Sequence, residues 1–288
     1  AVITATVLDP SRIHTWTGGI GGALSYVANW REVFAGTDYF DAGQYSNPQP
    51  FRHVWSFAIE EQFYLFAPFF LLACLRWLNR RWLVAVSVIA ALASAVWMSV
   101  VFDPRDASTV TRAYYGTDTR AFALFLGIAL AVTIRWWGPP RSAHGHVATQ
   151  IAAGVALLTY VVLIFNVDER SSWMFEWGGF LLVAVLSMVL VRAATLDSGW
   201  FQWLFRNRFL RWAGRLCFGL YLYHWIVLIM VDRDTDADQP GLNNPRDMVV
   251  AIGVTLLLAW ASYRWIERPF IKGRWPGWRL TGALAAGA

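Results

Sequence analysis

The sequence predicts an all-α protein, a polytopic bundle of transmembrane helices. The first observation is composition, because 57% of the 288 residues are hydrophobic and 15% are charged, whereas soluble domains carry about 25% charged residues. The second is a series of long stretches without charge, and the third is that the loops between them alternate in charge. These features exclude a disordered chain, a disulfide-stapled secreted domain and a nucleic-acid-binding tail.

Seven stretches of 14 to 21 residues contain no Asp, Glu, Lys or Arg. About 20 residues cross the hydrocarbon core, and flanking arginines can reach the headgroups. The stretches lack the alternating polarity of barrel strands, and a backbone in lipid must satisfy its own hydrogen bonds. We therefore expect spans at residues 57–78, 82–102, 118–137, 147–167, 174–193, 214–231 and 247–266.

The first 34 residues are less regular. Residues 1–8 resemble the tail of a span, whereas residues 18–34 are short, Gly-rich and interrupted by Asn29, Arg31 and Glu32. We expect this second segment to be re-entrant or to lie in the interface. The chain has no linker or repeat, so we expect one membrane domain over 1–288. It also begins in mid-apolar sequence, so we expect that N-terminal helices are missing.

The loop charges predict the orientation. One alternate set of loops holds 15 basic and 2 acidic residues, at 76–81, 135–146, 192–215 and 264–288. The other set holds 7 basic and 15 acidic residues, at 35–61, 103–120, 168–176 and 232–247. Basic loops face the cytoplasm, so we expect a multi-pass protein of the cell membrane with a cytoplasmic C-terminus.

Polar groups at membrane depth are costly, so each is a candidate site. His224 stands nine residues after Arg215 and eight before Asp232, which predicts a position near the midplane. Tyr221 shares its helical face. A neutral imidazole could take a proton from a hydroxyl nucleophile, with Tyr221 as donor or orienter. A hydrogen bond that holds the bundle together explains His224 equally well.

The segment from Trp55 to Tyr64 places two acids near the start of a span. Ser56, Glu60 and Tyr64 are four apart and share a face, while Glu61 projects about 100° away. The carboxylates could hold a polar acceptor or pair with a cation. They could also mark the water boundary and favour the helix N-terminus. Because Gln and Tyr follow the two acids directly, we favour a functional role.

Three arginines are further candidates. Arg120 could pair with Glu60 or Glu61, stabilise an oxyanion or an anionic group, or simply reach the headgroups. Arg264 and Arg268 could meet the phosphates of a cytosolic donor, although anchoring at the cytoplasmic side is the favoured explanation. We expect Pro269 to end the last helix. The cysteines and histidines have no metal-site spacing.

Four strings together resemble the type-three acyltransferase family of integral membrane proteins. The string Trp-Ser-Phe-Ala-Ile-Glu-Glu-Gln-Phe-Tyr at 55–64 resembles the family signature Ser-Leu-x-Val-Glu-Glu-Gln-Phe-Tyr. The family's other motifs are matched, in the same order, at 117–120, 219–225 and 262–270. The resemblance covers nearly the whole chain. One departure is His224-Trp-Ile, where the family has His-x-Pro.

The resemblance implies about ten helices and transfer of an acyl group, commonly acetyl, from a coenzyme A thioester to a hydroxyl of an extracytoplasmic or lipid-linked saccharide. The family's first helix, which carries its usual catalytic His, has no counterpart here, so the chain given could be inactive. We expect Glu60, Glu61, Arg120 and His224 to be catalytic. Substrate binding is expected of Trp55, Ser56, Tyr64 and Tyr221, and donor binding of Arg264 and Arg268.

The implied partners are the lipid bilayer, the saccharide acceptor and acyl-CoA as co-substrate, with no bound cofactor, metal or nucleic acid. Two other classes remain open. A midplane His and outer carboxylates also suit a transporter or flippase of a lipid-linked saccharide. A non-catalytic scaffold subunit would tolerate replacement of the outer acids and of His224.

Overall fold

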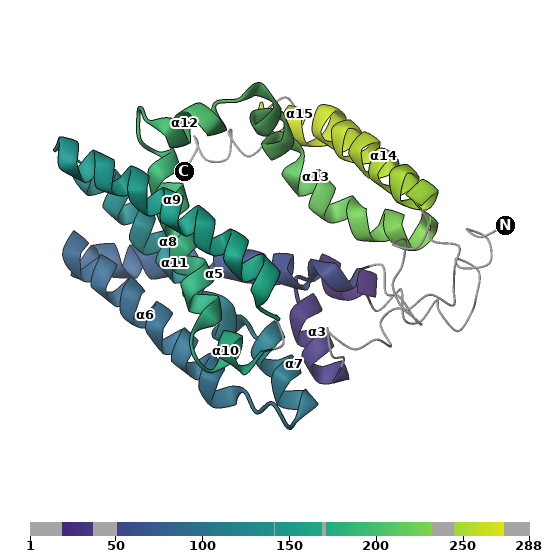
Figure 1. Ribbon diagram of the computed structural model, residues 1–288. Coiled ribbons are helices and arrows are strands. Elements are labelled where there is room, and N and C mark those ends of the chain that lie inside the picture. Colours follow the sequence, from purple (N-terminus) through teal and green to yellow (C-terminus); the bar gives the residue numbers. More distant parts are fainter. Residues whose placement is uncertain (1–18, 37–50, 141, 169–170, 232–244, 274–288) are drawn as a thin grey trace, which may run out of the picture. The chain divides into compact units, whose positions relative to one another are not determined.

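The protein is all-helical over the residues that its structure, a computed structural model, describes, which are 19–36, 51–140, 142–168, 171–231 and 245–273. These residues form two compact units. The larger unit contains the described residues from 19 to 206, and the smaller unit those from 207 to 273. Figure 1 shows the helices of each unit.

Within the described residues, six helices are long and apolar enough to cross a membrane, which confirms the predicted polytopic helical bundle. They cover Arg52–Trp77, Arg80–Val101, Ala107–Trp137, Ala143–Asn166, Arg208–Val231 and Pro245–Ile271. A shorter apolar helix, α11 (Gly179–Ala194), has 16 residues. The predicted span at 174–193 includes this helix together with α10 (Ser172–Phe175), and the two are separated at Gly178, whose φ is 79°. The predicted limits of the spans and the single domain over 1–288 stay predictions.

The larger unit begins with two short helical segments. Residues 19–24 are helical and precede α3 (Ala28–Ala35), with a turn at Tyr26 between them. Neither segment is long enough to cross a membrane. The predicted span tail at residues 1–8 lies outside the described residues.

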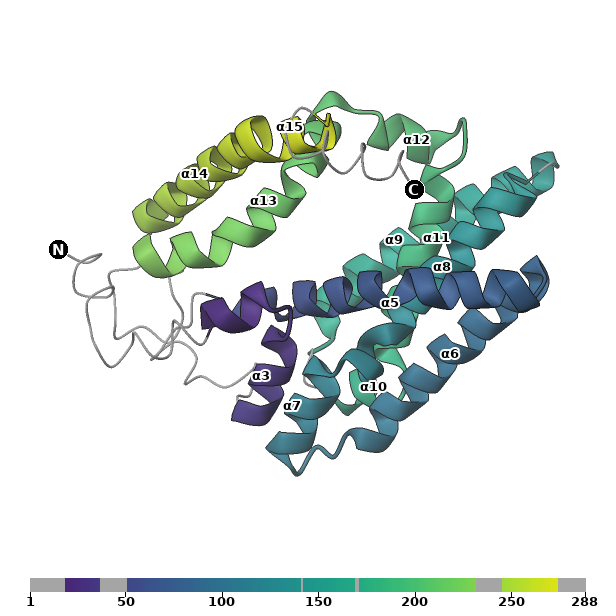
Figure 2. The same cartoon turned by 180° about the vertical axis from the view of Figure 1, so that it is seen from behind.

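The remaining helices of the larger unit follow in chain order. They are η1 (Arg52–Val54), α5 (Trp55–Trp77), α6 (Arg80–Val101), α7 (Ala107–Tyr115), α8 (Thr117–Trp137), α9 (Ala143–Asn166), α10, α11 and α12 (Trp200–Phe205). Figures 1 and 2 show α6 running beside α8, and α3 beside α7. Helices α5, α8 and α11 begin at one end of the larger unit, the acidic-loop end. Helices α6 and α9 begin at the opposite end, the basic-loop end.

Side-chain caps start several of these helices. The Asn79 side chain accepts from the first-turn amides of α6, and Ser142 accepts from Gly145 N at 3.1 Å at the start of α9. Asp106 accepts from both the hydroxyl and the amide of Ser108 at the start of α7. The Ser108 hydroxyl, followed by its amide, holds the pKa of the Asp106 carboxyl below its usual range. Such caps satisfy amides that a helix leaves unpaired.

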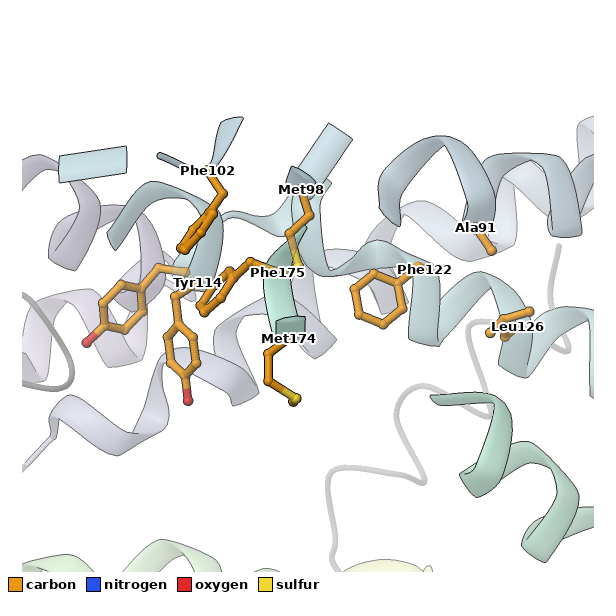
Figure 3. Close-up of a cluster of buried hydrophobic side chains, with 10 residues drawn as sticks. Ala91, Met98, Phe102, Tyr114, Phe122, Leu126, Met174 and Phe175 are labelled. Atoms are coloured by element: carbon orange, nitrogen blue, oxygen red, sulfur yellow. The ribbon is translucent and has the colours of Figure 1, made fainter. Parts of the chain in front are cut away.

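An aromatic cluster packs the acidic-loop end of the larger unit (Figure 3). Phe102 and Phe175 stack with ring centroids 4.3 Å apart and an interplanar angle of 7°. Tyr114 of α7 lies beside Phe175, with centroids 6.3 Å apart. Met98 of α6 and Phe122 of α8 join the same buried cluster. These contacts fix the junction of α7 and α8, from which Arg120 projects.

The smaller unit is built on α13 (Arg208–Val231) and α14 (Pro245–Ser262), which run side by side in Figures 1 and 2. Gly219 lies at their closest approach, because a Cβ added there would come within 2.9 Å of Ala259 Cα. Ala259 itself is fully buried. Small residues of this kind let the backbones of membrane helices approach closely.

The prediction that Pro269 ends the last helix is wrong. The π-helical turn η2 (Tyr263–Glu267) follows α14, and α15 (Arg268–Ile271) continues the helical backbone past the proline. Pro269 lies in the first turn of α15, where its missing N–H and its fixed φ are tolerated. The wide turn before it makes this possible, since π turns change the register of the hydrogen bonds.

Candidate active site

A buried ion pair lies where α3 meets η1. Glu32 is 2% exposed, and its Oε1 accepts a hydrogen bond from Arg31 Nη1 at 2.9 Å. The second carboxylate oxygen lies 3.8 Å from Nε of Arg52, which is 6% exposed. His53, the next residue of η1, is also buried. Buried charges persist only when they are paired, so this pair fixes α3 against the start of α5.

A second polar group joins α3, α5 and α8. Asn29 Nδ2 donates to the Tyr115 carbonyl at 3.0 Å and to Thr117 Oγ1 at 2.9 Å. Gln62 Nε2 donates to Asn29 Oδ1 at 2.9 Å and to the Tyr26 carbonyl at 2.6 Å. Thr117 Oγ1 closes the triangle by donating to Gln62 Oε1 at 2.6 Å. A satisfied network of this kind makes the local structure rigid.

Arg120 projects from the first turn of α8 into an aromatic cage. Its Nε donates to the Tyr114 carbonyl at 2.9 Å. The guanidinium carbon lies 4.0 Å from the ring centroid of Phe180, 4.3 Å from that of Tyr114 and 5.7 Å from that of Trp55. Aromatic faces attract a cation most strongly where water is excluded. The cage therefore holds a positive charge in a fixed place at the acidic-loop end.

Helix α5 carries the predicted carboxylate pair in its second turn. Glu60 is exposed and Tyr64 is 58% exposed, whereas Ser56 and Glu61 are half-buried. The spacing of four residues places Ser56, Glu60 and Tyr64 on one face of α5. Pro68 lies inside the same helix and cannot donate to the Tyr64 carbonyl. The carboxylates, a hydroxyl and a phenol are thus collected along one short stretch of a membrane helix.

Asp118, in the first turn of α8, has partners in two other helices. Its Oδ2 accepts from Arg112 Nη2 and from Trp97 Nε1, both at 2.7 Å, while Gly116 occupies the N-cap position of α8. The Asp118 carbonyl also accepts from Ser94 Oγ at 2.5 Å. This cluster ties α8 to α6 and α7, two residues before Arg120.

His224 lies in α13 of the smaller unit and is exposed there. Its Nδ1 is 2.7 Å from the Tyr221 carbonyl and 3.1 Å from the Leu220 carbonyl. Since a carbonyl oxygen only accepts, these contacts place the proton of the neutral ring on Nδ1 and make Nε2 the basic nitrogen. The rings of Tyr221 and His224 are 6.1 Å apart.

The two C-terminal arginines follow α14. Arg264 lies in the π-helical turn η2 and Arg268 opens α15, and both are exposed. Glu267 accepts a hydrogen bond from Ser262 Oγ at 3.1 Å. The exposed guanidinium groups can therefore donate hydrogen bonds to anionic oxygens of solutes or of lipid headgroups.

The structure brings some of the predicted site residues together. Trp55 lies against Arg120, and Ser56, Glu60, Glu61 and Tyr64 share α5 with Trp55. The contacts of Arg120 include three aromatic rings and the Tyr114 carbonyl. The other predicted site residues belong to the smaller unit. They are Tyr221, His224, Arg264 and Arg268.

Sequence patterns did not single out the ion pair of Glu32 with Arg52, or His53 beside it, as site residues. One signal was present, because Asn29, Arg31 and Glu32 interrupt an otherwise apolar segment. Their partners lie in other helices, so no local spacing shows the pairing. Within the described part of the chain, His, Cys, Asp and Glu form no group of three that could hold a metal ion.

The chain matches a family model described as an acyltransferase domain over residues 16–285. It is 31% identical over 274 residues to the peptidoglycan O-acetyltransferase of Listeria monocytogenes, covering 94% of the chain and 43% of that protein. A Bacillus subtilis protein, provisionally named a peptidoglycan O-acetyltransferase, is 32% identical over 275 residues, covering 93% of the chain and 42% of that protein.

A Staphylococcus aureus protein, provisionally named an O-acetyltransferase, is 30% identical over 278 residues, with 93% of the chain and 44% of that protein covered. The chain thus spans less than half the length of the relatives it matches. No solved structure matches it.

Proposed function

The chain belongs to this acyltransferase family, and on that premise we propose that it is a membrane O-acetyltransferase acting on a hydroxyl of a peptidoglycan-type saccharide. The names of the relatives support the acetyl group and the acceptor. The observation that carries the proposal is the buried polar structure at the acidic-loop end, where the Glu32–Arg52 pair and the Asn29–Gln62–Thr117 triangle frame the start of α5. Buried charged and polar groups are costly, and in membrane proteins such groups mark functional sites.

Glu60, Glu61 and Arg120 are proposed to position the acceptor. Ionised carboxylates accept hydrogen bonds from sugar hydroxyls, and the two acids project from adjacent positions of α5. Arg120 presents a cation that the aromatic cage holds in place, which suits the oxyanion that forms when a hydroxyl attacks a carbonyl. Ser56 and Tyr64 share a face with Glu60 and add hydroxyl groups, while Trp55 completes the cage.

The base that takes the proton of the attacking hydroxyl is proposed to be the His that the family carries on its first helix. The acceptor oxygen forms a new bond to the acyl carbon, and the bond from that carbon to sulfur breaks. The proton then passes from the imidazole to the leaving thiolate, which leaves as a thiol. His224 and Tyr221 are proposed to line the passage between the two faces of the membrane.

The donor is proposed to be acyl-CoA, a soluble co-substrate. Its phosphates would meet the exposed guanidinium groups of Arg264 and Arg268. This assignment requires those residues and the C-terminus to face the cytoplasm, which the excess of basic residues in their loops supports. The acceptor would then be modified on the opposite side, where the acidic loops lie.

A matched pair of variants tests the role of the carboxylates. Membranes that carry the full-length protein are incubated with coenzyme A labelled in its acetyl group, and label is followed into glycan. We expect Glu60→Gln to abolish transfer, because the amide removes the charge but keeps the shape. Glu176→Gln, at an exposed position next to α10, serves as the control and should transfer normally. Unchanged transfer in Glu60→Gln would falsify its assigned role.

A further inference from the structure

A cavity of about 500 Å³ lies between α6, α8, α9 and α11 of the larger unit. Its lining includes Val88 of α6, Ala129 of α8, Ala152 of α9, and Met188 and Arg192 of α11. Binding pockets for small ligands span roughly 300 to 1,000 Å³, so this space is large enough for a ligand. None of the residues proposed above for acyl transfer lines it.

The cavity occupies the basic-loop half of these helices. Helices α6 and α9 begin at that end, α8 and α11 end there, and the lining residues come from those ends. From Leu126 to the end of α8 at Trp137, the helix rises by about 16 Å. That depth corresponds to one half of a hydrocarbon core of about 30 Å. On α8 the lining itself runs from Leu126 to Thr133, so the floor of the cavity lies about one membrane leaflet below the basic-loop end of the helix.

Small side chains keep the space open. Ala129 is buried in α8, whereas Ala148 and Ala152 are exposed on α9 and also line the cavity. A larger side chain at either alanine of α9 would enter the space. Because exposed residues form part of the wall, the cavity opens sideways through the surface of the larger unit.

The wall is apolar except at one end. The Thr133 hydroxyl donates to the Ala129 carbonyl at 2.7 Å and the Thr149 hydroxyl to the Gly145 carbonyl at 2.9 Å, so both donors are used within their own helices. Arg192 is the charged residue of the lining.

The Arg192 guanidinium donates to the Gly138 carbonyl at 2.7 Å and to Thr195 Oγ1 at 3.3 Å. These acceptors are neutral, so they do not compensate the positive charge, and no carboxylate among the described residues pairs with it. A guanidinium also has further N–H groups.

We propose that this cavity binds one acyl chain of an anionic phospholipid, with the lipid phosphate at Arg192. The apolar walls match the chain, the floor lies about one leaflet deep, and the cation lies at the basic-loop end where a headgroup would lie. Anionic lipids are attracted to membrane surfaces that carry basic residues. A coenzyme A thioester fits the cavity less well, because it carries a nucleotide and several phosphates against a single arginine in the lining.

Photo-crosslinking tests this assignment. The full-length protein is reconstituted in vesicles that contain phosphatidylglycerol with a diazirine in its acyl chain, and crosslinked peptides are mapped by mass spectrometry. We expect adducts to concentrate in the segments 126–133, 148–152 and 188–192. Excess phosphatidylglycerol should compete, and phosphatidylcholine should compete less well. Uniform labelling of all lipid-facing helices would overturn the proposal, and so would displacement of the adducts by acetyl-CoA.

Two matched pairs of variants separate the chain from the headgroup. Ala152→Leu should fill the cavity and remove most of the adducts there, whereas Ala131→Leu, at an exposed position of α8 outside the lining, should not. Arg192→Gln should weaken competition by phosphatidylglycerol roughly fivefold, the effect of one arginine near anionic lipid. Arg192→Lys should restore it, and Arg135→Gln, exposed at the end of α8, should leave it unchanged.

The pattern of adducts decides between the outcomes. Equal labelling of Ala152→Leu and Ala131→Leu would exclude the cavity as the binding site. Equal competition by phosphatidylglycerol in wild type and Arg192→Gln would exclude Arg192 as the headgroup contact. Positions 131 and 152 are both exposed, so we expect the two alanine variants to melt close to the wild type. Such melting temperatures show that the variants are folded.

Discussion

Asn29 is fully buried, and its side chain connects α3 with α5, α7 and α8. Its amide donates to Tyr115 and Thr117 and accepts from Gln62. Removing it leaves buried groups without these partners, at a cost of about 1–3 kcal/mol for each unsatisfied group. We therefore predict that Asn29→Ala lowers the melting temperature in detergent.

Asn166→Ala is the matched control, since that exposed amide donates to a carbonyl of its own helix. The control should melt close to the wild type. If the Asn29 and Asn166 variants melted at the same temperature, the hydrogen-bond network of Asn29 would not contribute to the stability of the protein.

Arg120 is held by stacking as well as by charge. A lysine keeps the charge but has no planar group to lie between Phe180 and Tyr114. We predict that Arg120→Lys lowers the turnover number by roughly a hundredfold, the effect of losing one donor to a developing oxyanion. Turnover of labelled acetyl groups measures this. Arg105→Lys, at an exposed loop position, is the control, and equal turnover in both variants would contradict the assigned role.

Part of the candidate site could be predicted from residue patterns. The spacing of Ser56, Glu60 and Tyr64 is local to one helix, so it indicated their common face. The partners of Gln62 could not be predicted in the same way, because Asn29 is 33 positions away and Thr117 is 55 positions away. Hydrogen bonds between distant segments depend on how the helices pack, and no local period encodes that.

At the scale of the element, the crossing of α13 and α14 gives a sharp contrast between two glycines of one helix. A Cβ at Gly219 would lie 2.9 Å from Ala259 Cα, whereas a Cβ at Gly214 meets nothing within 4 Å. We predict that Gly219→Ala destabilises the protein by about 1–3 kcal/mol, the usual cost of overpacking.

Gly214→Ala should leave stability unchanged or raise it by up to about 1 kcal/mol, because alanine favours helix. Thermal unfolding of both variants in detergent measures the difference. A Gly219 variant that melts no lower than the Gly214 variant would mean that the close crossing does not exist.

The helical class was predictable, because apolar stretches without charge favour helices. The bounds of single helices depend on more than the absence of charge, since α6 and α13 include the charged residues Arg80 and Arg208. The break at Gly178 and the continuation past Pro269 depend on backbone conformation. A left-handed glycine and a π-helical turn leave little trace in hydropathy.

At the scale of the whole molecule, composition and loop charge were enough to predict a polytopic membrane protein, and the six long apolar helices found in the described part of the chain agree with that. The alternation of charge was independent of any motif, since a missed span would have mixed the two sets of loops. The two sets of loops predict that donor and acceptor lie on opposite sides of the membrane. Consumption of the thioester is the property that separates acyl transfer from transport of an intact saccharide.

Vesicles that contain the full-length protein in one orientation test that claim most directly. Acetyl-labelled coenzyme A is supplied on the side of the basic loops and a peptidoglycan fragment on the side of the acidic loops. The account predicts label in ester linkage on the fragment, release of coenzyme A thiol in equal amount, and loss of both in Glu60→Gln. Movement of unmodified saccharide across the membrane with the thioester intact would contradict it.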